Sequence, residues 1–186
     1  MEHIYQQPQF GENWFGGVEP LYSKFVEHMT NGSVFVEVGC WKGKSISYMG
    51  VEIVNSGKNI KCFAVDTWRG SEEHQADDLI INDTLYDLFL QNTESLSHVI
   101  TPIRKPSVEA AKDFTDGSVD IVYIDANHTY EEVKKDIQAW LPKVKKGGII
   151  SGHDYGGWEG VTRAVNEAFP LGIVYSPTGA TWYTQV

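Results

Sequence analysis

The sequence has 186 residues, 41% of them hydrophobic and 22% charged, which is the size and composition of one soluble globular domain. The formal net charge of −10 argues against nucleic-acid binding, because phosphate recognition relies on clustered Lys and Arg. No apolar stretch approaches the roughly 18 residues of a membrane span, the first residues lack a secretory-signal pattern, and Cys40 and Cys62 lack the spacing of a zinc site or a disulfide framework. We therefore expect a cytoplasmic protein without nucleic-acid or membrane partners.

The first half of the chain predicts an arm followed by alternating helices and strands. Residues 1–17 are polar, aromatic and glycine-rich without periodicity, which is typical of an arm packed over a domain. Apolar residues at helical spacing predict helices over 18–30, after residue 43 and over 76–92, the last with Ile81, Leu85, Leu88 and Phe89 on one face. Short apolar runs predict buried strands at 34–38 and 60–65.

The second half continues the alternation and closes with a hairpin. Apolar runs predict strands at 98–103, 119–124 and 147–151, and helical spacing predicts helices over 129–141 and 158–169. Two short runs at 172–175 and 180–184 flank a Ser-Pro-Thr-Gly turn, the pattern of a β-hairpin. This order predicts an α/β domain over residues 1–186, with a mostly parallel sheet of seven strands, helices on both faces and an antiparallel strand from the hairpin.

A glycine turn follows the first predicted strand. It reads Glu37-Val-Gly-Cys-Trp-Lys-Gly43, in which Gly39 permits a sharp turn close to a ligand and Gly43 permits close packing at the start of a helix. The turn lacks the GxGxxG spacing of a dinucleotide site, and its leading acid suits a ligand with donor groups or positive charge rather than a pyrophosphate. The alternative interpretation is an ordinary β–α turn with acids at the surface.

Asp66 ends the second predicted strand, 23 residues after Gly43. A carboxylate at this place can accept hydrogen bonds from both hydroxyls of a ribose, as acids do at similar spacing in dinucleotide sites. Together with the turn, it predicts a cofactor that contains adenosine, and S-adenosylmethionine supplies the ammonium, sulfonium and ribose groups that these acids suit.

Two further acids follow neighbouring strands. Asp125 ends the fourth predicted strand and Asp154 follows the fifth, so their carboxylates can share a hard divalent cation, and a nearby histidine admits Mn²⁺. His128 lies three residues past Asp125 and can accept a proton from a hydroxyl. The alternative interpretation is that Asp125 and Asp154 cap the helices that follow and that His128 is a cap or a support for Asp125.

Four segments resemble the class I S-adenosylmethionine-dependent methyltransferases, with the right order and gaps. They are VEVGCWKGKS at 36–45, VDTWRGSEEH at 65–74, YIDANHTYEEVKKDI at 123–137 and GGIISGHDY at 147–155. More narrowly, the chain is similar over residues 34–169 to the small O-methyltransferases that include macrolide-sugar enzymes and relatives of catechol O-methyltransferase. The resemblance implies a Rossmann-like, doubly wound fold.

The resemblance also implies a set of cofactor residues. Glu37, Gly39 and Gly43 would border the methionine part, Asp66 would hold the ribose, and Thr67 and Trp68 would flank the adenine, although Trp68 can also be a surface aromatic. Ser107 would lie at the adenine edge. With the rest of the turn, the predicted cofactor residues are Glu37, Gly39, Cys40, Trp41, Gly43, Ser45, Asp66, Thr67, Trp68, Ser107 and Asp125.

In the resembled family a divalent metal is held by the acid after strand four and an acidic pair after strand five. This chain has His153-Asp154 in place of that pair, which predicts Asp125, His153 and Asp154 as ligands of Mg²⁺ or Mn²⁺ and leaves open that His153 stays unbound. The resemblance implies that His128 is the catalytic base beside Asp125, with His74 a weaker candidate near the entrance.

The predicted function is therefore O-methylation of a small hydroxylated molecule, such as a sugar or a phenol. Aromatic residues near the strand ends would form an apolar wall for this acceptor, and the arm and the helix over 76–92 are candidate lids; the wall residues would be Tyr130, Tyr155, Trp158 and Trp182. Two other functions stay open, namely an oxidoreductase with a nicotinamide cofactor and a module that binds the cofactor without chemistry. The short chain also leaves open a homo-oligomer in which a second subunit completes the site.

Overall fold

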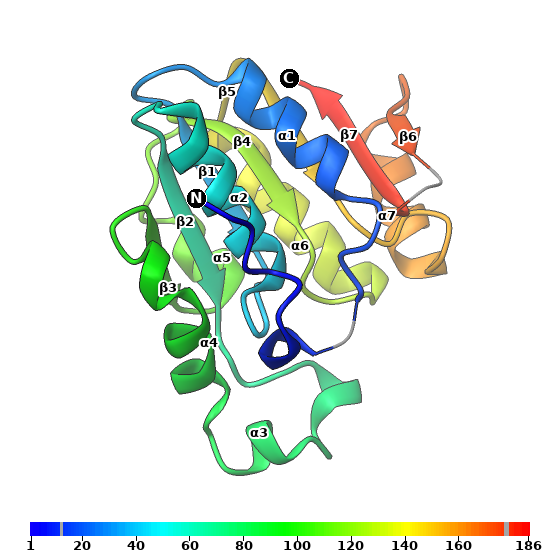
Figure 1. Ribbon diagram of the computed structural model, residues 1–186. Coiled ribbons are helices and arrows are strands. Elements are labelled where there is room, and N and C mark those ends of the chain that lie inside the picture. Colours follow the sequence, from blue (N-terminus) through cyan, green and yellow to red (C-terminus); the bar gives the residue numbers. More distant parts are fainter. Residues whose placement is uncertain (12, 177–178) are drawn as a thin grey trace.

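The computed structural model describes residues 1–11, 13–176 and 179–186. Within this part of the chain one sheet contains seven strands in the order β3-β2-β1-β4-β5-β7-β6 (Figure 1). The strands are β1 (Val34–Val38), β2 (Lys61–Asp66), β3 (Ile100–Arg104), β4 (Val119–Ile124), β5 (Val144–Gly152), β6 (Val174–Ser176) and β7 (Thr181–Gln185).

The first five strands are parallel, and β7 and β6 add an antiparallel hairpin at one edge. The strand order reverses between β1 and β4, so the chain leaves β1 toward β2 and later returns to pair β4 on its other side. This is the doubly wound, Rossmann-like arrangement that the alternating pattern predicts, and such sheets bind ligands beyond the carboxyl ends of the strands at the reversal.

Helices cover both faces, as expected for a parallel sheet whose central strands are mostly buried (Figure 1). One core lies between the sheet and α1 (Glu19–His28), α2 (Lys44–Ser56) and α4 (Leu85–Thr93). The other lies between the sheet and α5 (Ser107–Ala111), α6 (Tyr130–Trp140) and α7 (Glu159–Ala168).

The helix predicted over 76–92 is wrong as one element. It is two helices, the short α3 (Asp78–Ile81) and α4, separated at Asp83, whose φ of +51° lies outside the helical region. Leu85 and Phe89 are buried on the expected face, but Ile81 is exposed. The side chain of Asp77 caps α3 by accepting from the N–H of Leu79, a local start signal that marks a separate helix.

Other differences are smaller. The sequence pattern missed α5, and β5 begins at Val144, before the glycines at which the fifth strand was predicted. The predicted hairpin is confirmed by the pairing of β6 with β7, while its turn includes residues 177–178, which lie outside the described residues.

The N-terminal arm packs back onto the domain. Tyr5, Phe10 and Phe15 are buried, and a short 3₁₀ turn spans Pro8–Phe10. The arm therefore lies where the sequence predicts a cover. Within the part of the chain that the structure describes, none of the helices combines the length and the apolar character needed to cross a bilayer.

Candidate active site

A cavity of about 630 Å³ opens where the parallel strands end. Its wall combines the turn after β1, the ends of the neighbouring strands with the loops that follow, and the N-terminal arm. The predicted cofactor residues in this wall are Gly39, Cys40, Trp41, Ser45, Asp66, Thr67, Ser107 and Asp125, and the predicted catalytic and metal residues are His128, His153 and Asp154. The fold therefore brings most of the predicted site residues to one cavity.

The turn after β1 packs against the end of β4 through backbone atoms. Gly39 has a φ of +87°, and a Cβ at this position would lie 2.0 Å from the carbonyl oxygen of Asp125. The N–H of Asp125 donates to the carbonyl of Val38 at 2.7 Å. Glycine is required here both for the left-handed backbone and for the close approach, which places the turn and Asp125 on the same cavity.

Asp66 fastens the turn from the neighbouring strand. Its Oδ2 accepts from the backbone N–H groups of Cys40 at 2.8 Å and Trp41 at 3.0 Å, and its Oδ1 accepts from the N–H of Trp68 at 2.7 Å. Burial raises the pKa of Asp66, and these N–H groups oppose the rise. A fourth backbone hydrogen bond, from Thr67, also stabilises the carboxylate. Backbone donors therefore take up most of the roughly four acceptor positions of Asp66, which holds the turn in place.

Glu37 does not line the cavity, contrary to the prediction. Its side chain is fully buried behind the turn, where Oε2 accepts from the hydroxyl of Tyr22 at 2.8 Å and Oε1 from the hydroxyl of Ser45 at 2.6 Å. Burial raises the pKa of Glu37 to about 8, although both hydroxyl donors oppose the shift. Glu37 therefore supports the cavity wall through Ser45.

Trp68 and Gly43, both predicted to contact a cofactor, also lie outside the cavity wall. The Trp68 ring is fully buried between Tyr86 and Phe89, at 4.6 Å from each ring, and its Nε1 donates to the carbonyl of Trp41 at 2.9 Å. A Cβ on Gly43 would lie 2.9 Å from the side chain of Thr93 in α4. Both residues serve the packing of α4 behind the turn.

Ser107 lines the cavity as predicted, and the structure adds a partner that the sequence did not identify. Nε1 of Trp140 donates to Oγ of Ser107 at 2.9 Å, and Ser107 is also hydrogen-bonded to the carboxyl group of Asp136. Asp136 is 5% exposed and forms part of the cavity wall. In the sequence, Asp136 looks like one more charged residue of an amphipathic helix, so the pattern did not single it out.

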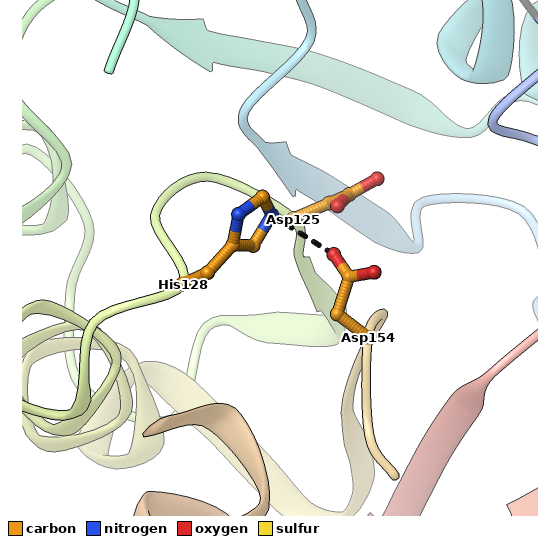
Figure 2. A group of neighbouring side chains, drawn as sticks. All are labelled: Asp125, His128 and Asp154. Atoms are coloured by element: carbon orange, nitrogen blue, oxygen red, sulfur yellow. Dashed lines mark ion pairs between the residues drawn. The ribbon is translucent and has the colours of Figure 1, made fainter. Parts of the chain in front are cut away.

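Figure 2 shows Asp125, His128 and Asp154 together, brought from the loops after β4 and β5. One potential ligand atom of each lies within 4.8 Å of the others. Nε2 of His128 is 3.0 Å from Oδ2 of Asp154, and the imidazole stacks on the ring of Trp158 with centroids 4.4 Å apart. This group can bind a cation or exchange a proton with a ligand in the cavity.

The second nitrogen of His128 faces a carboxylate that the sequence did not predict. Oε1 of Glu73 lies 3.0 Å from Nδ1. Among the described residues, however, none is oriented to form a hydrogen bond with this nitrogen. Burial lowers the pKa of His128, but its hydrogen bond to Asp154 and the charges of Asp154, Glu73 and Asp125 outweigh burial and raise it above the ordinary value. Glu73 lies in the segment 65–74 that resembles the methyltransferases, but its contact with His128 is apparent only in the folded chain.

His153 lies beside the group of Asp125, His128 and Asp154. Its Nδ1 is 3.5 Å from Oδ1 of Asp125 and 3.3 Å from Oδ2 of Asp154. Burial alone lowers the pKa of His153, but the two carboxylates raise it to about 10. Despite burial, the hydrogen bond from His128 and the contact with His153 hold the pKa of Asp154 well below its usual range. The group of potential ligand atoms within 4.8 Å of one another thus contains His128, where the sequence predicted His153.

Only some of the residues that were predicted to cover the acceptor form part of the cavity wall. Trp158 and His74 are in the wall, whereas Tyr130, Tyr155 and Trp182 are outside it. From the arm, the wall includes Phe10, Trp14 and Phe15, and the Trp41 and His74 rings are 4.5 Å apart at this side. The predicted lid over 76–92 is wrong in position, because the loop at 70–74 lines the cavity in its place.

Comparison with known proteins identifies the family. A family profile described as "Methyltransferase domain" matches residues 36–155, more than half of the chain. The uncharacterized protein y4gI of Sinorhizobium fredii is 28% identical over 133 residues, 72% of this chain but 14% of that protein. The uncharacterized protein R132 of Acanthamoeba polyphaga mimivirus is 28% identical over 160 residues, 81% of this chain and 67% of that protein.

Solved structures share the fold at low sequence identity. The O-methyltransferase NovP superposes with a TM-score of 0.67 at 17% identity, covering 90% of this chain and 78% of NovP. CalS11, a TDP-rhamnose 3′-O-methyltransferase of calicheamicin biosynthesis, gives 0.63 at 18% identity, covering 90% and 76%. A SAM-dependent O-methyltransferase from Thermotoga maritima gives 0.58 at 12% identity, covering 86% and 55%.

The sheet order, the glycine turn against Asp125 and the profile match agree with one another. They remove the basis for a nicotinamide-dependent oxidoreductase. The chain belongs to the family of methyltransferase domains.

Proposed function

We propose that this methyltransferase acts on a hydroxyl group of a compact small molecule, such as a sugar or a phenol. The observation that carries the proposal is the single cavity shared by the glycine turn and the group of Asp125, His128 and Asp154. Methyl transfer to oxygen needs a donor and an acceptor held in line and a group that receives or weakens the acceptor proton. The cavity offers residues for both needs.

The residues present suit an adenosyl cofactor. Gly39 lets the turn approach the backbone of Asp125 closely, and the carboxylate of Asp66 lies in the same cavity wall, where it can accept from a ribose hydroxyl. The hydroxyl of Ser107 lies in the same wall. S-adenosylmethionine supplies the methyl group on a positively charged sulfonium, and the acidic groups around the cavity favour that charge.

The donor set also suits a divalent cation. Asp125 and Asp154 offer carboxylate oxygens and His128 offers Nε2, a mixture that suits Mg²⁺ less than Mn²⁺ or a similar transition metal. Such a cation would lower the pKa of the acceptor hydroxyl. Beside this group, His153 contacts both carboxylates and helps to orient them. Glu73 lies next to Nδ1 of His128, the place that the outer partner of a metal-binding histidine usually takes.

A second role for His128 is favoured by the same contact with Glu73. Glu73, at 3.0 Å from Nδ1, favours a proton on that nitrogen. Nε2 would then accept the proton of the acceptor hydroxyl without a metal once the hydroxyl takes the place of Asp154 beside it. In this mechanism Asp125 and Asp154 orient the acceptor and stabilise the imidazolium. Metal ligation and base catalysis use the same nitrogen, so they are alternatives that an experiment can separate.

The size of the cavity supports a compact acceptor. Its volume of about 630 Å³ must hold the cofactor as well as the acceptor, within the range of ordinary ligand pockets. The stacked rings of His128 and Trp158 offer a flat apolar surface of the kind that packs against a sugar or a phenol. NovP and CalS11 are both O-methyltransferases, which supports a hydroxyl acceptor.

The test is transfer of a labelled methyl group from S-adenosylmethionine to a panel of sugars, nucleotide sugars and phenols. We expect product from at least one hydroxyl compound, loss of activity in excess EDTA and recovery with Mn²⁺. Direct titration of Mn²⁺ into the protein should show binding that Asp154→Asn weakens and the exposed control Asp116→Asn does not. Full activity in EDTA combined with loss in His128→Asn selects the base mechanism, and products methylated only at nitrogen or carbon would refute the proposal.

A further inference from the structure

One buried carboxyl group in the cavity wall has no part in the proton chemistry described above. Asp136 lies in the middle of α6, is 5% exposed and lines the cavity. Burial raises the pKa of Asp136 to about 6, and the hydrogen bond with Ser107 opposes the shift. A buried carboxyl group is costly unless donors satisfy it, so its presence at the edge of a ligand cavity calls for a donor from the ligand.

The neighbours of Asp136 fix which hydrogen bonds it can make. The indole of Trp140 is a donor only, and its Nε1 gives its hydrogen to Oγ of Ser107 at 2.9 Å. The single hydroxyl hydrogen of Ser107 is then available for the hydrogen bond with Asp136. Asp136 therefore accepts from Ser107, and its carboxylate has further acceptor positions that a donor in the cavity can use.

The place of Asp136 in the fold indicates which part of a ligand it meets. Ser107 opens α5 directly after β3, and Lys105 and Pro106 continue the wall beside it. β3 pairs with β2 so that Arg104 lies opposite Asp66, which puts this wall next to the acid proposed to meet the ribose. A base attached to that ribose would therefore lie within the wall formed by the β3–α5 loop and α6.

Adenine offers one kind of hydrogen-bond donor at its base edge. In a nucleoside its ring nitrogens are acceptors, and only the 6-amino group carries hydrogens on a polar atom. A 6-oxo base such as hypoxanthine presents an acceptor oxygen at the same place, which an anionic carboxylate would repel, and its one base-edge donor is moved to N1. A buried carboxylate at this wall is thus a means to select a 6-aminopurine.

We propose that Asp136 is a specificity-determining residue that accepts a hydrogen bond from the 6-amino group of the cofactor's adenine, with Ser107 and Trp140 holding it in position. The inference rests on the proposed cofactor site and goes beyond it by naming the residue that reads the base. It concerns binding, and it does not depend on the acceptor or on the metal.

The test compares two ligands by titration calorimetry, S-adenosylhomocysteine and its 6-oxo analogue S-inosylhomocysteine. The wild-type protein should prefer the adenosyl ligand by about 100-fold, because the analogue places an oxygen opposite the buried carboxylate and carries its base-edge donor at N1 instead. Asp136→Asn should reduce this ratio at least about tenfold, since the amide can also donate to the 6-oxo oxygen. Glu131→Gln, an exposed change on the same helix, should leave the ratio unaltered.

Equal weakening of both ligands by Asp136→Asn, with the ratio unchanged, would show a structural role only and overturn the inference. If that variant does not fold by circular dichroism, Ser107→Ala is the substitute, because it removes the group that orients Asp136 and should lower the same ratio several-fold; an unchanged ratio again contradicts the inference. A wild-type protein that binds neither ligand would overturn the cofactor site itself, and this inference with it.

Discussion

Gly39→Ala tests whether the turn and the end of β4 are held together by backbone contact. The added Cβ would lie 2.0 Å from the carbonyl oxygen of Asp125 and 2.6 Å from Cα of Ala126, so atoms of the backbone must move. The left-handed φ of +87° adds strain of about 1–2 kcal/mol for a residue with a Cβ. Overpacking adds about 1–3 kcal/mol, which gives a loss of about 2–5 kcal/mol in the free energy of unfolding.

Gly32→Ala is the matched control. Gly32 has nearly the same φ, +85°, but a Cβ there would meet no atom within 4 Å. Its cost should be the strain alone, about 1–2 kcal/mol. The difference between the two variants therefore isolates the contact between the turn and the end of β4.

Urea unfolding followed by circular dichroism gives both free energies under one set of conditions. In a chain of this size each 1 kcal/mol lowers the Tm by about 2–4 °C, so the gap is also visible in thermal melts. Calorimetry should show that Gly39→Ala loses affinity for S-adenosylhomocysteine while Gly32→Ala keeps it. Equal destabilisation of the two variants, or full affinity in Gly39→Ala, would refute the close approach of the turn to Asp125.

Two further predictions concern residues that the structure places behind the cavity. Burial raises the pKa of Glu37 from its unfolded value near 4.5 to about 8, so folding takes up a proton between these pH values, and the free energy of unfolding should fall as pH rises through this window. Urea titrations at several pH values should show a smaller decline in Glu37→Gln than in the wild type. Parallel curves for the two proteins would contradict the buried carboxyl group. Trp68→Phe should lower the free energy of unfolding by about 2–4 kcal/mol, because it leaves a void beside Phe89 and leaves the carbonyl of Trp41 without its donor. The affinity of this variant for S-adenosylhomocysteine should stay within about threefold of the wild type. A loss of affinity above tenfold in calorimetry would indicate that Trp68 contacts the adenine after all.

Local patterns predicted the sheet well because each strand is a short apolar run between helical segments. The runs at 34–38 and 119–124 match β1 and β4 in full, and the glycine turn and the acids that follow the strands were found at the carboxyl edge, where parallel strands end. The helix over 76–92 failed because its apolar period continues across Asp83, where the backbone leaves the helical region. Periodicity records which residues face the core, and it does not record where a helix is interrupted.

Side-chain direction was the part of the site that the sequence could not supply. Glu37 and Trp68 stand beside lining residues in the chain, yet both point into the core, and strands buried on both faces give no alternation from which to read this. Glu73 reaches His128 across the fold, and Asp136 meets Ser107 between two helices. Such contacts join distant residues of ordinary composition, so only the folded chain identifies them.

The most direct test of the central claim is a calorimetric titration of the protein with S-adenosylhomocysteine, for the wild type and Asp66→Ala. We predict saturable binding at one site and an affinity at least about tenfold lower in the variant, because Asp66 orders the turn and is proposed to accept a hydrogen bond from the ribose. Asp116→Ala, an exposed acid paired with Lys143, should bind like the wild type. No binding by the wild type, or an unchanged affinity in Asp66→Ala, would contradict the assignment of the cavity to this cofactor.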